Sequence, residues 1–142
     1  MKPILKLDNQ LCFALYTANR KMTQHYKPLL DPFNLTYPQY LVMLVLLEED
    51  HITVNTLGQK LYLDSGTLTP LLKRMEKHGY VTRKRSEEDE RKVIITLTEV
   101  GRQLEEALEE VPKKLVYAVD AGVDELIELR ERLNKLIDSM TK

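Results

Sequence analysis

Residues 61–97 read LYLDSGTLTPLLKRMEKHGYVTRKRSEEDERKVIITL, and this stretch decides the fold. Leu68, Leu72 and Met75 recur at three-to-four-residue spacing, which predicts one apolar face of an amphipathic helix. Gly79 ends that pattern, as is usual where a helix stops. A short apolar segment at 54–61 predicts the first helix of a helix-turn-helix, with 62–64 as the turn and the basic helix as its second half.

The start of the basic helix depends on which residue caps it. Ser65 is the expected N-cap, and Thr69 is the alternative, because Pro70 has no backbone N–H to donate to Gly66. The sequence leaves open these two starts, which lie about one helical turn apart.

Two strand-like runs follow this helix. Residues 81–85 and 91–97 favour strands, and Val93, Ile95 and Leu97 alternate along the second, so the runs predict a hairpin with the segment 86–90 as its tip. Residues 52–54 are a short β-prone run that could add a third strand. A helix followed by a basic hairpin is typical of a winged helix-turn-helix, in which the helix enters the DNA major groove and the wing reaches the flanking backbone or minor groove.

The helix and the hairpin carry the residues that we expect to contact double-stranded DNA. On charge alone they would suit a solvated surface, but their order, spacing and sign agree with the winged fold. The expected contacts from the helix are Ser65, Thr67, Thr69, Lys73, Arg74 and Lys77, and those from the hairpin are Arg83, Lys84, Arg85, Arg91 and Lys92.

Composition agrees with one folded domain. The chain has 142 residues, a formal net charge of -1, 43% hydrophobic residues and 30% charged residues. The charge is segregated, because basic residues crowd the segment 73–92 while the C-terminal third is acidic. Affinity for DNA depends on where charge lies rather than on its sum, so the slightly negative total does not exclude a nucleic-acid partner.

The sequence offers little for metal binding, disulfides or membrane insertion. One cysteine, Cys12, excludes an intrachain disulfide and a four-cysteine metal site. His25, His51 and His78 lie on different expected elements, so we expect no metal site and no cofactor. The longest apolar run, 40–47, is too short to cross a bilayer, and the N-terminus lacks the apolar core of a signal peptide. We therefore expect a cytoplasmic protein with no membrane partner.

Helices are expected on both sides of this centre. Residues 8–30 follow a four-then-three apolar spacing, and Thr36 with Gln39 forms a capping-box pattern at the start of a second helix that runs to about 49. That second helix is apolar on nearly every side, so we expect it to be the buried centre of the domain. After the wing, Thr98 should cap a helix that Pro112 kinks, and 123–140 predicts a final helix.

The apolar seams of the terminal helices exceed what a small winged domain needs to close its core. Their expected partner is the same region of a second chain; the alternative is an intrachain helical hairpin. The expected fold is mainly α with a small β-hairpin wing, a single winged helix-turn-helix domain over 1–142 that dimerises through its N- and C-terminal helices. Residues 35–98 would form the DNA-binding lobe, and 1–34 with 99–142 the helical dimerisation region. A homodimer would place two recognition helices about 34 Å apart, which matches a palindromic operator.

Three motifs resemble one family. The block DSGTLTPLLKRME at 64–76, the triplet Asp89-Glu90-Arg91 followed by the ITLT run that ends at Thr98, and NQLCF at 9–13 resemble the MarR family, specifically its one-cysteine OhrR-like branch. The resemblance covers essentially the whole chain. It implies a homodimeric transcriptional repressor that senses organic hydroperoxides and leaves its operator when the cysteine is oxidised. It also implies that Arg91 enters the minor groove while Asp89 holds its guanidinium group.

From the residues alone, Cys12 has two interpretations. A lone cysteine is usually a small core residue, but the positive end of the helix that starts near Cys12 favours a thiolate. Tyr16 lies on the same helix stripe, whereas Cys12 and Tyr26 are fourteen residues apart, about 21 Å along a straight helix. A contact between Cys12 and Tyr26 or Tyr37 must therefore come from elsewhere in the fold, and the resemblance implies that this tyrosine pair comes from the other subunit. We expect a redox sensor at the dimer interface that holds Cys12, Tyr26 and Tyr37, with Tyr16 nearby.

The expected chemistry starts with oxidation of the thiolate to a sulfenic acid. A mixed disulfide with a small thiol or further oxidation follows, because the chain has no resolving cysteine, and a bridge between two Cys12 residues is the minority outcome. Three other functions stay open. They are a one-cysteine thiol peroxidase, which the basic helix and wing disfavour, a repressor of the same fold gated by a small phenolic ligand with Cys12 a bystander, and a winged-helix protein-interaction module. We expect a regulator and not an enzyme.

Overall fold

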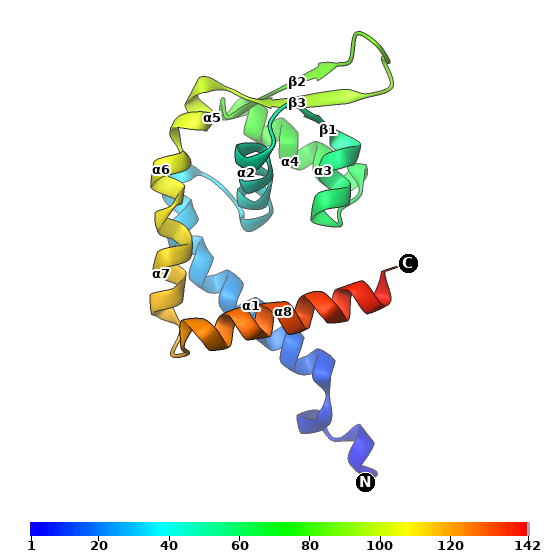
Figure 1. The fold of residues 1–142 in the computed structure, drawn as a ribbon, viewed down its shortest axis with the longest axis vertical. Helices are drawn as coiled ribbons and strands as arrows, with labels where there is room; N and C mark the ends of the chain where they lie inside the picture. Colours follow the sequence, from blue (N-terminus) through cyan, green and yellow to red (C-terminus); the bar gives the residue numbers. More distant parts are fainter. Residues whose placement is uncertain (142) are drawn as a thin grey trace.

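The computed structural model of the chain describes residues 1–141 and consists of helices around a small sheet (Figure 1). The helices are α1 (Leu11–Leu30), α2 (Tyr37–Glu48), α3 (Val54–Leu61), α4 (Ser65–Lys77), α5 (Glu99–Gln103), α6 (Glu105–Leu108), α7 (Glu110–Ala118) and α8 (Val123–Met140). The strands are β1 (Ile52–Thr53), β2 (Val81–Arg85) and β3 (Val93–Leu97), and three short 3-10 turns are η1 (Pro3–Leu5), η2 (Leu7–Asn9) and η3 (Asp31–Phe33). The predicted winged helix-turn-helix is therefore confirmed, with α3 and α4 as its two helices.

The wing is a three-stranded antiparallel sheet in the order β1-β3-β2. Ile52 pairs with Ile95, so the expected third strand is present at β1. The prediction that the second hairpin strand starts at 91 is wrong by two residues. The Lys92 N–H donates to the Asp89 carbonyl at 2.9 Å, and the Ser86 N–H donates to the Lys92 carbonyl at 2.8 Å. Residues 91 and 92 therefore belong to the turn at the wing tip, and β3 begins after them.

Hydrogen bonds from side chains near the helix starts determine where α2 and α4 begin. Thr36 and Gln39 form the predicted capping box: the Gln39 N–H donates to Thr36 Oγ1 at 3.4 Å and the Thr36 N–H to Gln39 Oε1 at 2.9 Å. The prediction of Ser65 as the cap of the basic helix is wrong. Asp64 is the N-cap, because its Oδ1 accepts a 2.7 Å hydrogen bond from the Thr67 N–H, and Ser65 is the first helical residue.

The hydrophobic core lies between α2, α3, α4 and the sheet. Val42, Met43 and Leu46 of α2 are fully buried, which confirms that this helix forms the centre, although Leu44 on its outer face is 40% exposed. The expected apolar face of α4 is also buried against it. The other fully buried side chains of this core are Leu57, Leu68, Leu72, Met75, Val81 and Ile95.

The terminal helices differ in how they pack, because α1 contacts α2 and α7 whereas α8 makes few contacts with the rest of the described chain. In α8 no residue is buried, and in α1 the only buried residue is Leu30. The N-terminal half of α1 and the turns before it extend away from the winged lobe (Figure 1). Within residues 1–141, no helix has both the length and the apolar character needed to cross a membrane.

Two expectations about helix boundaries need correction. α1 starts at Leu11 rather than at residue 8, because residues 3–9 fold into η1 and η2. The helix after the wing is interrupted at Leu104 and at Glu109 instead of being kinked at Pro112, which is the third residue of α7. The second interruption lies just before the proline, whose ring crowds the carbonyl of residue 108 and cannot donate to it.

Candidate functional site

The start of α4 and the base of the wing border one small cavity. This cavity has a volume of about 190 Å³ and lies between β1, α3, α4 and the β2–β3 hairpin. Five of the predicted DNA contacts line it: Ser65, Thr69, Arg83, Arg91 and Lys92. The fold therefore brings together side chains from the recognition helix and the wing that are up to 27 residues apart in sequence.

The first turn of α4 presents hydroxyl groups and helix N–H groups to solvent. Ser65 and Thr67 are exposed, and the Thr69 hydroxyl donates to the Ser65 carbonyl at 2.7 Å, which leaves its lone pairs free to accept. The hydrogen bond from the Thr67 backbone N–H is the main cause that lowers the pKa of Asp64 below its usual range. This carboxylate stays charged at neutral pH and holds the helix start in place.

The basic residues of the site differ in how free their side chains are. Lys73, Arg74, Lys77, Lys84, Arg85 and Lys92 are all exposed. Arg83 is different, because its Nε lies 3.5 Å from Glu76 Oε1 and its backbone N–H donates to Glu76 Oε2 at 3.1 Å, which links β2 to α4. Arg85 Nη1 donates to the Glu90 carbonyl at 2.8 Å and so braces the wing tip. Sequence spacing alone did not indicate these two internal roles.

Asp89 holds Arg91 through three hydrogen bonds, which is the contact predicted between them. The Arg91 Nε and its backbone N–H both donate to Asp89 Oδ1 at 3.1 Å, and Nη2 donates to Oδ2 at 3.3 Å. Arg91 is the main cause that lowers the pKa of Asp89 below its usual range. The Arg91 side chain is nevertheless 91% exposed, so the ion pair fixes its direction without hiding it.

The predicted sensor residues fall into two separate places, and Cys12 and Tyr16 lie in the first half of α1. Cys12 is the second residue of α1 and is exposed, and the N-cap Gln10 makes no side-chain cap to the helix start. The first-turn N–H groups are thus available near the sulfur. Tyr16 follows one turn later, is 59% exposed, and has the Arg20 guanidinium 4.8 Å from its ring centre.

Tyr26 and Tyr37 form a cluster with a third tyrosine, Tyr40, that the sequence analysis did not select. The ring centres of Tyr26 and Tyr37 lie 4.6 Å apart, and Tyr40 lies 5.8 Å from Tyr26 and 6.1 Å from Tyr37. The three-residue spacing of Tyr37 and Tyr40 on α2 was the signal that could have identified Tyr40.

Burial raises the pKa of each tyrosine in the cluster. Burial, and then the neighbouring rings, raise the pKa of Tyr26 from the ordinary 10.0 to about 12. Burial is also the first cause that raises the pKa of Tyr37 and that of Tyr40. At neutral pH all three phenols are therefore uncharged and able to donate hydrogen bonds.

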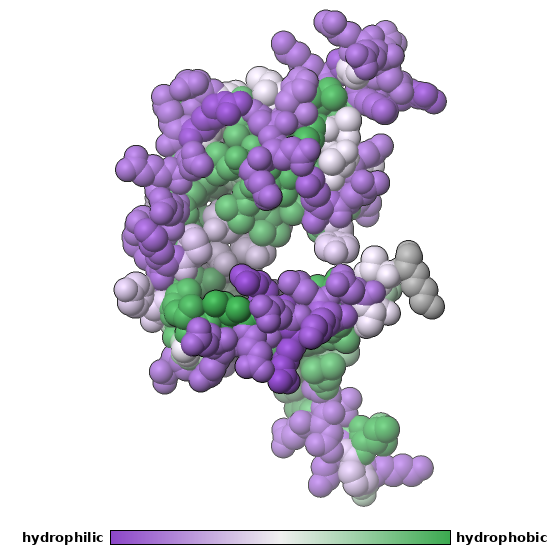
Figure 2. All heavy atoms as spheres, in the orientation of Figure 1, coloured by the Kyte–Doolittle hydropathy of each residue, from purple (hydrophilic) through white to green (hydrophobic). Residues whose placement is uncertain are grey.

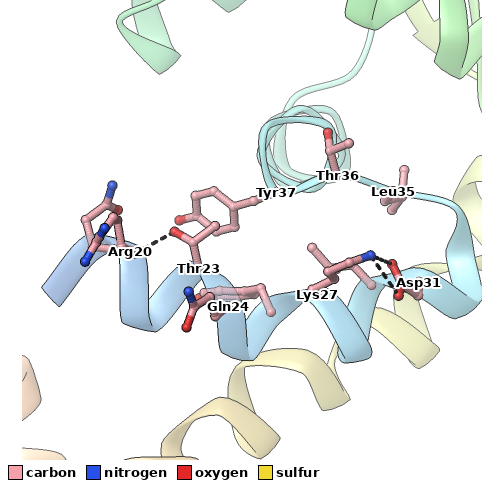
Figure 3. Close-up of a pocket in the computed structure, with 11 residues that line it drawn as sticks. Arg20, Thr23, Gln24, Lys27, Asp31, Leu35, Thr36 and Tyr37 are labelled. Carbon is pink, nitrogen blue, oxygen red and sulfur yellow. Dashed lines mark hydrogen bonds and ion pairs between the residues drawn. The ribbon is translucent and has the colours of Figure 1, made fainter. Parts of the chain in front are cut away.

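A cavity of about 550 Å³ opens beside this cluster, between the second half of α1 and the start of α2 (Figure 3). Tyr26, Tyr37, Thr23 and Thr36 are among its lining residues, and Cys12 is not. The fold thus brings two predicted sensor tyrosines together within one chain and leaves Cys12 of the same chain apart from them.

Comparison with known proteins identifies the family. The family model described as transcriptional regulator SarA/Rot matches residues 24–108. An organic hydroperoxide resistance transcriptional regulator of Bacillus subtilis is 52% identical over 136 residues, covering 96% of this chain and 92% of that protein. The HTH-type transcriptional regulator SarZ of Staphylococcus saprophyticus is 42% identical over 132 residues, covering 93% of this chain and 90% of that protein.

Solved structures that resemble this chain are also those of a DNA-binding regulator. The structure of reduced AbfR bound to DNA has a TM-score of 0.84 at 41% identity, covering 94% of this chain and 92% of that one. Disulfide-formed AbfR has a TM-score of 0.69 at 44% identity and covers 92% of both chains; AbfR is a protein of Staphylococcus epidermidis. The matched relatives are regulators, in agreement with the prediction that the chain is not an enzyme. The chain belongs to the MarR/SarA family of winged helix-turn-helix transcriptional regulators.

Proposed function

We propose that this protein is a homodimeric transcriptional repressor that binds a palindromic operator and releases it when an organic hydroperoxide oxidises Cys12. The observation that carries the proposal is the separation, within one chain, of Cys12 from the tyrosine cluster. Each chain has an exposed cysteine at the start of α1 and a protonated tyrosine cluster about 21 Å along the same helix. Two copies related by a two-fold axis would complete two sensor sites, each with Cys12 from one subunit and Tyr26 with Tyr37 from the other.

The exposed apolar helices support the dimer. Leu129 of α8 is 52% exposed and Ile127 is 39% exposed, while Leu11 and Phe13 of α1 are 63% and 43% exposed. Apolar faces of this size on helices with almost no buried residue are typical of surfaces that a second copy covers.

DNA contacts are assigned to α4 and to the wing hairpin. In this proposal the first turn of α4 enters the major groove with Ser65, Thr67 and Thr69, and Arg91 enters the minor groove in the direction that Asp89 sets. The remaining contacts would be ion pairs with phosphates, from Lys73, Arg74, Lys77, Arg83, Lys84, Arg85 and Lys92. A relative supports DNA as the partner, since AbfR at 41% identity has been solved bound to DNA.

The redox step uses one thiolate and one peroxide. The Cys12 sulfur attacks the terminal oxygen of ROOH, the O–O bond breaks, and the sulfur becomes a sulfenic acid while the alkoxide takes a proton and leaves as the alcohol. Protonated Tyr26 and Tyr37 of the partner subunit would donate hydrogen bonds that stabilise the thiolate. A small thiol then attacks the sulfenic sulfur, which forms a mixed disulfide and releases water.

We assign operator release to the mixed disulfide. AbfR has been solved bound to DNA in an overoxidised form as well as in a reduced form, so oxidation of that relative does not by itself prevent binding. A mixed disulfide adds a whole molecule to the interface, whereas sulfinic acid adds only oxygen atoms. The larger change separates the subunits more and so alters the spacing of the two α4 helices.

The decisive experiment measures operator binding by the wild type and by Cys12→Ser, with and without cumene hydroperoxide and a small thiol. We expect the wild type alone to lose binding, and intact mass to show the adduct. Cumyl alcohol replaces the peroxide as a control for binding without oxidation. Tyr26→Phe and Tyr37→Phe should slow oxidation, whereas Tyr117→Phe, at a residue that is 89% exposed, should not. Equal release of wild type and Cys12→Ser would refute the proposal.

A repressor gated by a phenolic ligand is the second candidate, because the 550 Å³ cavity beside Tyr26 and Tyr37 is large enough for a small aromatic molecule. It predicts that a phenol such as salicylate releases both the wild type and Cys12→Ser from DNA without a change in protein mass. No release of either variant by salicylate would exclude this ligand.

A further inference from the structure

The N-terminal arm, residues 1–9, is ordered and apolar and lies at the end of α1 remote from the winged lobe (Figure 1). Side chains hold its two turns together: Asn9 Nδ2 donates to the Pro3 carbonyl at 2.7 Å, and Gln10 Nε2 donates to the carbonyls of Ile4 and Lys6 at 2.8 Å. Its apolar side chains nevertheless face solvent, and Figure 2 shows them as a hydrophobic patch at that end. The exposed fractions are 95% for Met1, 77% for Ile4, 69% for Leu5 and 58% for Leu7.

A groove of suitable character lies between α2 and the α6–α7 segment. We call it the α2–α7 groove; its volume is about 370 Å³. Leu44, Leu47 and Leu108 contribute an apolar floor. Three exposed carboxylates border it: Glu48, Glu105 and Glu109.

The charges of the arm and the groove are complementary. The arm carries Lys2 and Lys6 against a single acidic residue, Asp8. Of the three glutamates of the groove, Glu109 is paired with Lys113 at 3.5 Å, so Glu48 and Glu105 supply the negative charge that faces an occupant. An arm with both apolar and basic side chains therefore matches a groove with an apolar floor and an acidic border.

The arm cannot reach the groove of its own chain. Leu11 and Tyr26, which contacts Tyr40 at the edge of the groove, are fifteen residues apart on α1, about 22 Å. The arm continues beyond Leu11 in the direction away from the lobe (Figure 1). Any occupant of the groove with the chemistry of the arm must therefore come from a second copy.

The position of the groove also suits an arm from a second copy. Tyr40 belongs to both the tyrosine cluster and the α2–α7 groove, so the groove begins where the proposed sensor site ends. The 2.7 Å hydrogen bond from Asn9 Nδ2 to the Pro3 carbonyl folds the arm into a compact unit. With Cys12 placed at the partner's tyrosines, this compact arm would lie at the end of the groove that begins at Tyr40.

We propose that the N-terminal arm of each subunit docks in the α2–α7 groove of the other, with Ile4, Leu5 and Leu7 on the leucine floor and the lysines beside the glutamates. This inference rests on the dimer of the proposed function and adds a surface to it. The arm then contacts both α2 of the DNA-binding lobe and α6–α7 of the helical region. An adduct on Cys12 would displace the arm from the α2–α7 groove, where it contacts both the DNA-binding lobe and the helical region.

Engineered disulfides test the docking in a Cys12→Ser background. The variant Leu5→Cys with Leu44→Cys is oxidised with oxidised glutathione and resolved by non-reducing electrophoresis. The matched control is Leu5→Cys with Tyr62→Cys, because Tyr62 is exposed in the turn before α4 and outside the groove. Each single variant controls for symmetric bridges. We expect a covalent dimer from the first pair only, since a disulfide requires Cα atoms within about 7 Å.

Sedimentation of the same proteins under reducing conditions separates the two proposals. A dimer in which the first pair crosslinks no more than the control overturns the docking and leaves the proposed function standing, whereas a monomer overturns both. A charge exchange gives an independent reading: Lys6→Glu and Glu48→Lys should each raise the dimer dissociation constant about tenfold, and together they should restore it. Additive weakening in the double variant would also overturn the docking.

Discussion

Gly58 is the residue of the helix-turn-helix at which one added methyl group has a consequence that the structure allows to be worked out. A Cβ at Gly58 would lie 2.5 Å from the Leu63 carbonyl oxygen and 3.3 Å from Leu68 Cδ1, whereas ordinary contacts begin at about 3.4 Å. Leu63 cannot easily move, because its own N–H donates to the Gly58 carbonyl at 3.0 Å. Gly58→Ala must therefore push α3 away from the turn and from α4.

Two opposing effects decide the size of the change. Alanine favours a helix interior over glycine by about 1 kcal/mol. The overlap of about 0.9 Å with a backbone atom cannot be relieved by a side-chain rotation, and overpacking of this kind costs about 1–3 kcal/mol or more. Since the overlap involves backbone, we take the upper part of that range and expect the free energy of unfolding to fall by about 1–2 kcal/mol. Operator affinity should fall as well, because α4 moves relative to the wing.

Urea denaturation followed by circular dichroism gives the stability, since the chain has no tryptophan. Fluorescence anisotropy with a labelled operator duplex gives the affinity. Gly66→Ala is the matched control, because its Cβ would approach only the Asp64 carboxylate, at 3.3 Å. A Gly58→Ala protein that is more stable than the wild type and binds DNA equally well would refute the reasoning about this close approach.

The remaining predictions concern a cap, the wing and the tyrosine cluster. Thr36→Ala removes the capping-box hydroxyl and should lower the free energy of unfolding by about 1 kcal/mol, measured by urea denaturation. Arg91→Ala should weaken operator binding and reduce the slope of log affinity against log salt by about one, because one phosphate or groove contact is lost. Asp89→Asn should weaken operator binding with little change in that slope, since it frees Arg91 to adopt other directions. The raised pKa of Tyr26, from 10.0 to about 12, means that the unfolded chain loses this proton at a lower pH than the folded chain. Stability, measured as the urea midpoint of unfolding, should therefore fall as pH rises from 10 towards 12. The midpoint of the Tyr26→Phe variant should fall less over the same range.

Much of the lobe could be predicted from sequence because its signals are local. The spacing of Leu68, Leu72 and Met75 and the capping box of Thr36 with Gln39 each depend on residues within one or two helical turns. Asp64 was missed as the cap because aspartate, serine and threonine all cap helices well, and Asp64, Ser65 and Thr69 lie within six residues of one another. Only the direction of the chain at the turn selects among them.

The parts that could not be predicted depend on contacts between distant residues. Glu76 takes up Arg83 because α4 and β2 pack side by side, and no spacing rule connects a helix residue with a strand residue. Tyr40 joins Tyr26 because α2 crosses the end of α1, although the two lie fourteen residues apart in sequence. The sensor site is even harder to predict from sequence, since in our proposal half of it belongs to a second copy of the chain.

α2 explains how an event at this interface would reach DNA. Tyr37 and Tyr40 lie on the face of α2 that meets α1, while Gln39, which is only 3% exposed, extends its Nε2 to within 3.5 Å of the Leu71 carbonyl in α4. The same helix thus contacts the sensor tyrosines and the recognition helix. Because the interior of α2 is fully packed around Val42 and Met43, a displacement of its first turn cannot be absorbed there and must move α4 as well. In the proposed dimer, the two α4 helices match a palindrome only when they are about 34 Å apart, so a small shift of α2 in each subunit would release the operator without changing any proposed DNA-contacting side chain.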